Sequence, residues 1–137
     1  MTAALRVIHE DGDRFGITVR GHRITVDQPG SDGGTDTGPT PTELLVASLA
    51  SCVAFYGQRF LVRHGVGRGL YVDAQWEMAS SPPRVSCISI TVEAPGLPVE
   101  LEGRFLKVIE HCTVHNTLSS PPKVLIGLFR VNVADAS

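Results

Sequence analysis

Residues 40–56 read TPTELLVASLASCVAFY and contain the longest apolar run in the 137-residue chain. Thr40 and Glu43 form a capping-box pattern with Pro41 at the first helical position, so the sequence predicts that a helix begins there. From Leu44 to Tyr56 every residue is apolar or small, which is typical of a helix that is buried on all sides. A chain of this length rarely covers such a helix by itself, so we expect a second subunit to supply part of the cover.

Strand patterns lie on both sides of this helix, which we expect to end between Arg59 and Gly65, with Arg63 near its end. Before the helix, β-branched residues alternate around turns that contain Gly12 and Gly21, and this predicts an antiparallel meander. The predicted strands are residues 5–10, 14–20, 22–27, 70–78, 84–93 and 123–133, and a second helix is predicted at residues 99–110. This order predicts an α+β fold with antiparallel sheets and a buried central helix.

Length and composition restrict the class of protein. A chain with 42% apolar and 19% charged residues fits one folded domain, residues 1–137, and is not globally disordered. The net charge is -2 and no Lys or Arg residues form a stripe that could neutralise phosphates, so we expect no nucleic-acid partner. Three cysteines, an odd number, argue against a secreted disulfide framework, so we expect a cytoplasmic protein with reduced thiols.

Neither the N-terminus nor the apolar segment indicates a membrane protein. The N-terminus lacks the charged and apolar regions of a secretory signal. A membrane span needs about 20 apolar residues, and the apolar run here has 13. We therefore expect no membrane insertion.

A loop rich in glycine and proline, residues 29–41, precedes the central helix. Gly33 and Gly38 have the spacing of a phosphate-binding loop, but Pro39 stands where that loop has its lysine. The segment therefore does not indicate nucleotide hydrolysis, and we expect a protein without a cofactor.

Cysteine is the reactive side chain whose placement suggests chemistry. Cys52 lies in the central helix, and helical periodicity places Ser48, Leu49, Phe55 and Tyr56 around it, which predicts a pocket of small and aromatic side chains. A buried cysteine in an apolar helix is more often a small hydrophobic core residue. This motif alone therefore favours a structural role.

The second cysteine motif, HCTVH, occupies residues 111–115. Cys112 lies where one helix ends and a short one could begin, and a helix N-terminus lowers the pKa of a thiol. His115 could act as its base, or His111, Cys112 and His115 could bind zinc, but no further ligand pattern completes a metal site. Nothing near Cys87 would stabilise a thiolate, so we expect it to be core or half-buried filler. We expect no metal.

Residues 27–52, DQPGSDGGTDTGPTPTELLVASLASC, and residues 111–118, HCTVHNTL, together resemble the OsmC/Ohr family of osmotically inducible and organic-hydroperoxide-resistance proteins. The family has a glycine- and proline-rich loop, a P-x-E-L-L-x-A-x-L-x-x-C helix and a C-x-V-H motif, and the resemblance covers nearly the whole chain. It implies an OsmC-like fold and an intertwined homodimer in which the two cysteines meet near the subunit interface. It also implies thiol-dependent reduction of organic hydroperoxides.

The resemblance assigns a role to each cysteine. Cys52 would be the peroxidatic thiol, which attacks the peroxide bond and becomes a sulfenic acid, and Cys112 would be the resolving thiol, which condenses with it to a disulfide. Leu49, Phe55 and Tyr56 would bind the organic part of the substrate. A dithiol, such as a dihydrolipoyl group, would reduce the disulfide.

Two charged residues of the family site have no exact match here. The family's activating arginine lies in an N-terminal strand, where Arg14 is the nearest match and Arg20 and Arg23 are alternatives. The family glutamate stands ten residues before the first cysteine, where this chain has Thr42, and Glu43 follows one position later. Helical geometry puts Glu43 about 180° around the axis and ~13 Å from that cysteine, which favours its capping role over a catalytic one. The alternative function is therefore a small-molecule-binding or redox-sensing module without efficient turnover.

Overall fold

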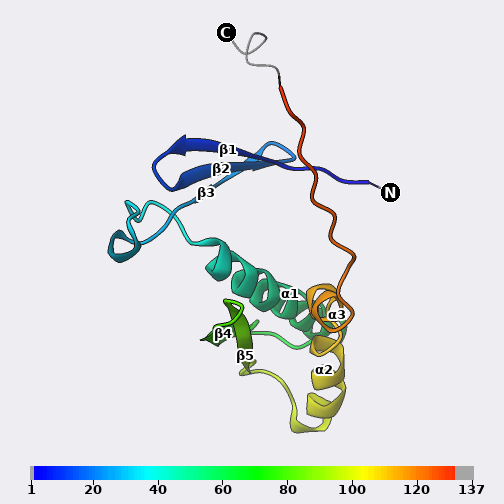
Figure 1. Ribbon diagram of the computed structural model, residues 1–137. Helices are drawn as coiled ribbons and strands as arrows, with labels where there is room; N and C mark the ends of the chain where they lie inside the picture. The colour runs from blue at the N-terminus through cyan, green and yellow to red at the C-terminus, as the bar shows by residue number, and fades with distance from the viewer. Residues whose placement is uncertain (1, 132–137) are drawn as a thin grey trace.

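The computed structural model describes residues 2–131 and has two antiparallel sheets and one long helix (Figure 1). The strands β1 (Arg6–Asp11), β2 (Arg14–Val19) and β3 (His22–Val26) form a three-stranded meander, and β4 (Tyr71–Ala79) and β5 (Arg84–Glu93) form a two-stranded sheet. The helical segments are η1 (Gly30–Asp32), α1 (Pro41–Arg63), η2 (Val99–Leu101), α2 (Glu102–Ile109) and α3 (Thr113–Ser119). The α+β class, the antiparallel sheets and the central helix are confirmed, and the predicted second helix begins with a 3-10 turn.

The long helix α1 begins at the predicted capping box. The hydroxyl oxygen of Thr40 accepts a hydrogen bond from the Glu43 amide at 3.1 Å, and the Thr40 amide donates to the Glu43 carboxylate at 2.8 Å. Pro41 fills the first turn, where no backbone donor is needed. The cap therefore fixes where the chain leaves the glycine-rich loop and enters the helix.

α1 is longer than its apolar run. Its 23 residues make it long and apolar enough, by length and composition alone, to cross a membrane, although the apolar run within it has only 13 residues. In this chain it packs against β4, β5, α2 and α3. Core helices of soluble proteins have the same composition and the same kind of packing, so the length of α1 alone does not indicate a membrane span.

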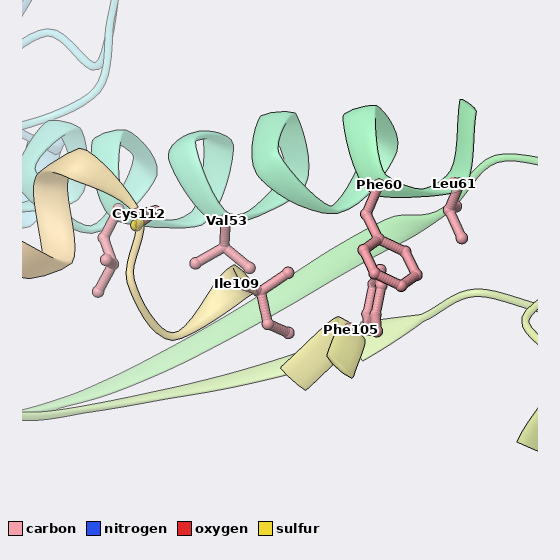
Figure 2. Close-up of a cluster of buried hydrophobic side chains, with 7 residues drawn as sticks. Val53, Phe60, Leu61, Phe105, Ile109 and Cys112 are labelled. Atoms are coloured by element: carbon pink, nitrogen blue, oxygen red, sulfur yellow. The ribbon is translucent and has the colours of Figure 1, made fainter. Parts of the chain in front are cut away.

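One hydrophobic core joins α1 to α2 and to the β4–β5 sheet. Figure 2 shows Val53, Phe60 and Leu61 of α1 directed toward the side chains of α2. The rings of Phe60 and Phe105 meet edge to face with their centroids 5.4 Å apart. Ile109 of α2 completes this contact one turn further along. The core therefore fixes α2 across the second half of α1.

The chain covers only one side of α1. Leu49 and Val53 are buried, but Leu45, Phe55 and Val62 are 40%, 55% and 67% exposed. One chain does not test the expected cover by a second subunit, and within it the helix is not buried on all sides. The reason is that α2, α3 and the β4–β5 sheet pack on one side of it, and no described residue covers the other.

The N-terminal sheet and the C-terminal segment stand clear of this core (Figure 1). Residues 121–131 are extended and exposed, without regular secondary structure. The predicted strand 123–133 is therefore wrong for residues 123–131, and residues 132 and 133 lie outside the described part. A strand forms only by pairing with another strand, and no described strand of this chain pairs with the segment.

A buried carboxylate organises the loop between β3 and α1. Asp27 is only 1% exposed, and its oxygens accept hydrogen bonds from the amides of Gln28 (2.7 Å) and Thr37 (3.1 Å) and from the hydroxyls of Thr35 (2.7 Å) and Thr37 (2.6 Å). These bonds, chiefly those from the Thr37 and Thr35 hydroxyls, lower the pKa of Asp27 far below its ordinary value although burial opposes them. Gly34 supports the same loop, because a Cβ there would lie 2.0 Å from the Gln28 carbonyl oxygen.

Replacing Asp27 by asparagine is expected to destabilise the fold in a pH-dependent way. The folded-state pKa of Asp27 is lowered, and an unfolded aspartate has a pKa of about 3.9. The ionised group therefore stabilises the fold above that pH, and the contribution is lost as the pH falls toward the folded-state pKa. Urea unfolding should show D27N well below the wild type at pH 7, with a gap that narrows below about pH 4.

Asp32 provides the matched control for this prediction. It is exposed in the same loop, so D32N should change the unfolding midpoint little at any of these pH values. A difference between D27N and the wild type that stays constant from pH 7 to pH 3 would contradict the stabilising role of the ionised carboxylate.

Candidate functional site

The helices α1 and α3 bring the two motif cysteines together. Cys52 lies half-buried on α1, and Cys112 is fully buried at the N-cap of α3. Cys52 packs against the core cluster that contains Cys112, close enough to raise the pKa of the Cys112 thiol, and both cysteines are free. Figure 2 shows Cys112 lying against α1, at one end of the hydrophobic core. Two sulfur atoms that are far apart in the sequence are therefore neighbours.

Burial sets the properties of Cys112. Removal of its sulfur from water raises the pKa of this thiol, and the neighbouring Cys52 raises it further. Hydrogen bonds from the amides of His115 and Val114 lower the pKa and partly offset these effects. The His115 amide donates to the Cys112 sulfur at 3.4 Å as the cap of α3. Cys112 is therefore a protonated thiol at neutral pH, while the more exposed sulfur of the pair belongs to Cys52.

The imidazole of His115 is turned away from the neighbouring thiol. Its Nδ1 donates to the carbonyl oxygen of Glu110, in the bend between α2 and α3. Only the backbone amide of His115 contacts the sulfur of Cys112. The alternative in which the His115 ring acts as a base for Cys112 is therefore not supported by this geometry, because the imidazole bonds to the bend instead.

Tyr56 links the two helices beside the cysteine pair. Its hydroxyl shares a 2.8 Å hydrogen bond with the hydroxyl of Thr113, the residue that follows Cys112. Tyr56 lies one helical turn beyond Cys52, so the bond holds the start of α3 against α1 at the level of the two sulfurs. The sequence placed Tyr56 near Cys52, but no local pattern relates it to Thr113.

The three predicted substrate-binding residues do not share one cavity in the chain. Leu49 lines a cavity of 250 Å³ together with Val53 of α1, strand β5 and His115. Phe55 and Tyr56 line a separate cavity of 530 Å³ between α1 and α2. Phe55 also lies on the open side of α1, so the exposure of its side chain depends on whether a partner covers that side.

The two charged candidates lie away from the cysteines. Glu43 is engaged in the capping box at the start of α1. Arg14 pairs with Glu10 at 3.4 Å in the β1–β2 hairpin, and Arg23 pairs with the same carboxylate. This sheet makes no substantial contact with α1 within the described part of the chain. The structure of one chain therefore does not bring Arg14 or Glu43 to Cys52.

Cys87 is exposed on β5, whereas the sequence predicted a core or half-buried position. The pairing of β4 with β5 shifts its register here: Glu77 pairs with Cys87, but Met78 pairs with Val85. This bulge moves Val85 and Cys87 onto different faces, so strict alternation fails at this point. The thiol of Cys87 therefore lies on the exposed side of the strand.

Comparison with known proteins identifies the family. A family model described as OsmC-like protein matches residues 33–126, which include most of the glycine-rich loop, all of α1 and both motif cysteines. The chain belongs to the OsmC-like protein family. No curated protein sequence matches the chain.

Solved structures extend this OsmC-like assignment to the fold. A protein from Psychrobacter arcticus assigned to the osmotic stress and detoxification response superposes with a TM-score of 0.75 at 24% identity, covering 85% of this chain and 88% of its own. An OsmC-like protein from Mycoplasma pneumoniae gives 0.73 at 18% identity, covering 88% and 89%. The organic hydroperoxide resistance protein OhrB of Bacillus subtilis gives 0.63 at 15% identity, covering 88% and 93%. At these identities the likeness concerns the fold alone.

The larger cavity of this OsmC-like chain is lined by cations. Arg59 and Arg63 come from α1, and Arg104 and Lys107 come from α2. The sequence shows no stripe of basic residues, because these four cations form two short pairs that are distant in the chain. Packing of α2 on α1 creates the cluster.

Proposed function

We propose that this OsmC-like protein is a two-cysteine peroxidase that reduces organic hydroperoxides. The family includes organic hydroperoxide resistance proteins, and OhrB of Bacillus subtilis shares the fold. The observation that carries the proposal is that the half-buried Cys52 packs against the core cluster that contains the fully buried Cys112. A pair of free thiols in contact can give up two electrons and form a disulfide.

Cys52 is the peroxidatic residue in this proposal. Its thiolate attacks one oxygen of the hydroperoxide, so that a sulfur–oxygen bond forms and the oxygen–oxygen bond breaks. The peroxide receives two electrons from the sulfur and leaves, after protonation, as an alcohol. Cys52 remains as a sulfenic acid.

Cys112 is the resolving residue. Its raised pKa keeps it protonated, so it does not compete with Cys52 for the peroxide, because the thiolate is the nucleophile. Its sulfur then displaces the hydroxyl of the sulfenic acid, a disulfide forms and water leaves. An external dithiol returns both cysteines to thiols by exchange, a step that fits the reducing cytoplasm.

A second subunit belongs to the proposal. Peroxide attack needs an ionised thiol, and a nearby arginine lowers the pKa of a thiol. In one chain Arg14 is engaged with Glu10 in a sheet that stands clear of α1. In an intertwined homodimer the partner's N-terminal sheet would cover the open side of α1 and carry an arginine toward Cys52.

The position of Glu43 favours a second candidate function, a redox-sensing module without efficient turnover. The residue is engaged in the capping box, and Thr42 stands where the hydroperoxidases have their glutamate. Without that carboxylate an arginine would be less firmly oriented at the thiol. Such a module would form the disulfide once but would turn over slowly.

Counting thiols tests the proposal. One equivalent of cumene hydroperoxide should reduce the free thiols from three to one per chain, and dithiothreitol should restore them. Cys52→Ser should keep its two remaining thiols under the same treatment. Multiple turnover with dihydrolipoamide distinguishes the peroxidase from the sensor, and unchanged thiols in the wild type would exclude both.

A further inference from the structure

We infer that the groove between α1 and α2 binds the head group of an amphiphilic carboxylate, a molecule with one carboxylate on a long hydrocarbon chain. The groove encloses 530 Å³ and is lined by Arg59, Arg63, Arg104 and Lys107. Its size lies in the range of small-molecule sites, about 300–1,000 Å³. If this ligand is itself a hydroperoxide, the inference rests on the proposed function, and the amphiphilic carboxylate is then the substrate class of the peroxidase.

The cations of the groove have no ion-pair partner among residues 2–131. Arg59 and Arg63 are four positions apart on α1, and Arg104 and Lys107 are three apart on α2. Like charges at these spacings face each other and destabilise a helix. The packing of the two helices then brings both pairs to one cavity. An anion bound there would relieve this repulsion.

The helix dipole accounts for only part of this arrangement. A cation is favourable in the last turn of a helix, where Arg63 of α1 and Lys107 of α2 lie. Arg104 is the third residue of α2, at the end where a positive charge is unfavourable. Arg59 lies a full turn before the end of α1. These two arginines therefore point to a ligand rather than to helix stabilisation.

The floor of the groove suits hydrocarbon. Phe55, Tyr56, Phe60 and Val108 line it between the cations. The Arg59 guanidinium lies over the Phe55 ring, 5.4 Å from its centroid, so this charge is held beside an apolar wall. Planar guanidinium groups bind carboxylates through paired hydrogen bonds. The cations and the apolar floor of the groove together fit a carboxylate with an apolar chain better than an inorganic anion.

One face of α1 connects this head-group site to the reactive thiol. Cys52, Tyr56, Arg59 and Arg63 are spaced at i, i+4, i+7 and i+11, which puts them within about 60° of one another around the axis. Arg63 is about 16 Å along the axis from Cys52. A long-chain fatty acid held at its carboxylate would therefore be long enough for its hydrocarbon chain to reach the cysteine pair.

Binding can be tested without any peroxidase activity. Calorimetry should show that dodecanoate binds the full-length protein at least about tenfold more tightly than dodecanol does, and that added salt weakens the binding. Arg63→Gln combined with Arg104→Gln removes one cation from each helix and should abolish the preference for the acid over the alcohol. Lys107→Gln alone should reduce this preference. Lys123→Gln, outside the groove, should keep it. Equal affinity for acid and alcohol in the wild type would overturn the inference.

Turnover tests the same site as part of the proposed function. The wild type should reduce a linoleic acid hydroperoxide with a kcat/KM about tenfold above that of its methyl ester. The R63Q/R104Q double variant should bring this ratio close to one. If no peroxidase activity exists, the dodecanoate experiment alone decides the inference. Binding of polyglutamate without binding of dodecanoate would assign the groove to an acidic protein and overturn it.

Discussion

Replacing Cys112 by serine is expected to lower the steady-state reduction of cumene hydroperoxide by about 10³-fold while the first reduction event still occurs. Cys52 is the more exposed thiol of the pair, and Cys112 has a raised pKa. The first step therefore needs only Cys52, whereas recycling needs the second sulfur. A rapid-quench experiment should show one equivalent of alcohol per chain and then almost none.

The fate of Cys52 in this variant gives an independent readout. With no resolving thiol beside it, the sulfenic acid persists and should be trapped by dimedone, which mass spectrometry locates on the peptide of Cys52. Cys52→Ser should lose both the burst and the steady state. Cys87→Ser should keep both, because that thiol lies exposed on β5. Wild-type turnover in C112S, or a burst in C52S, would contradict the assigned roles.

The parts of the fold that the sequence predicted well have local causes. The start of α1 depends on hydrogen bonds between Thr40 and Glu43, which are one turn apart, and both were predicted. The meander follows from alternating β-branched residues and from Gly12 and Gly21, whose φ values of 54° and 80° few other residues adopt. Signals that act within one turn or one hairpin can be read from the residues alone.

The features that the sequence missed join residues with no periodic relation. The carboxylate of Asp27 binds Thr35 and Thr37 across a loop, and Tyr56 binds Thr113 across two helices. The cation groove likewise depends on how α2 packs against α1. The meeting of Cys52 with Cys112 was expected only because two motifs resembled a family, since their spacing in the chain carries no geometry.

The other prediction with a large effect concerns assembly, because large apolar side chains of the single chain are exposed to water. Ile126 and Phe129 of the C-terminal segment are 94% and 87% exposed, Val62 of α1 is 67% exposed and Val7 of β1 is 53% exposed. Patches of this kind on a monomer mark interaction surfaces. We expect the wild type to sediment as a dimer at micromolar concentration, in which the C-terminal segment pairs with the partner.

Ile126→Asp combined with Phe129→Asp should therefore convert the dimer to monomer. Full burial of each side chain stabilises by about 1.5–3 kcal/mol, so the two losses together weaken dimerisation by about 10²- to 10⁴-fold. Analytical ultracentrifugation over a range of concentrations measures the change. Ser120→Asp adds a negative charge just before the segment and should leave the dimer intact.

The peroxidase activity of the same variant links assembly to chemistry. If the partner's sheet supplies the arginine that ionises Cys52, the monomeric variant should lose turnover even though its own Cys52 and Cys112 remain in contact. A wild type that sediments as a monomer and is fully active would contradict both points. In that case the cation for Cys52 must come from its own chain, and Arg59, two turns along the same face of α1, is the nearest cation on that face.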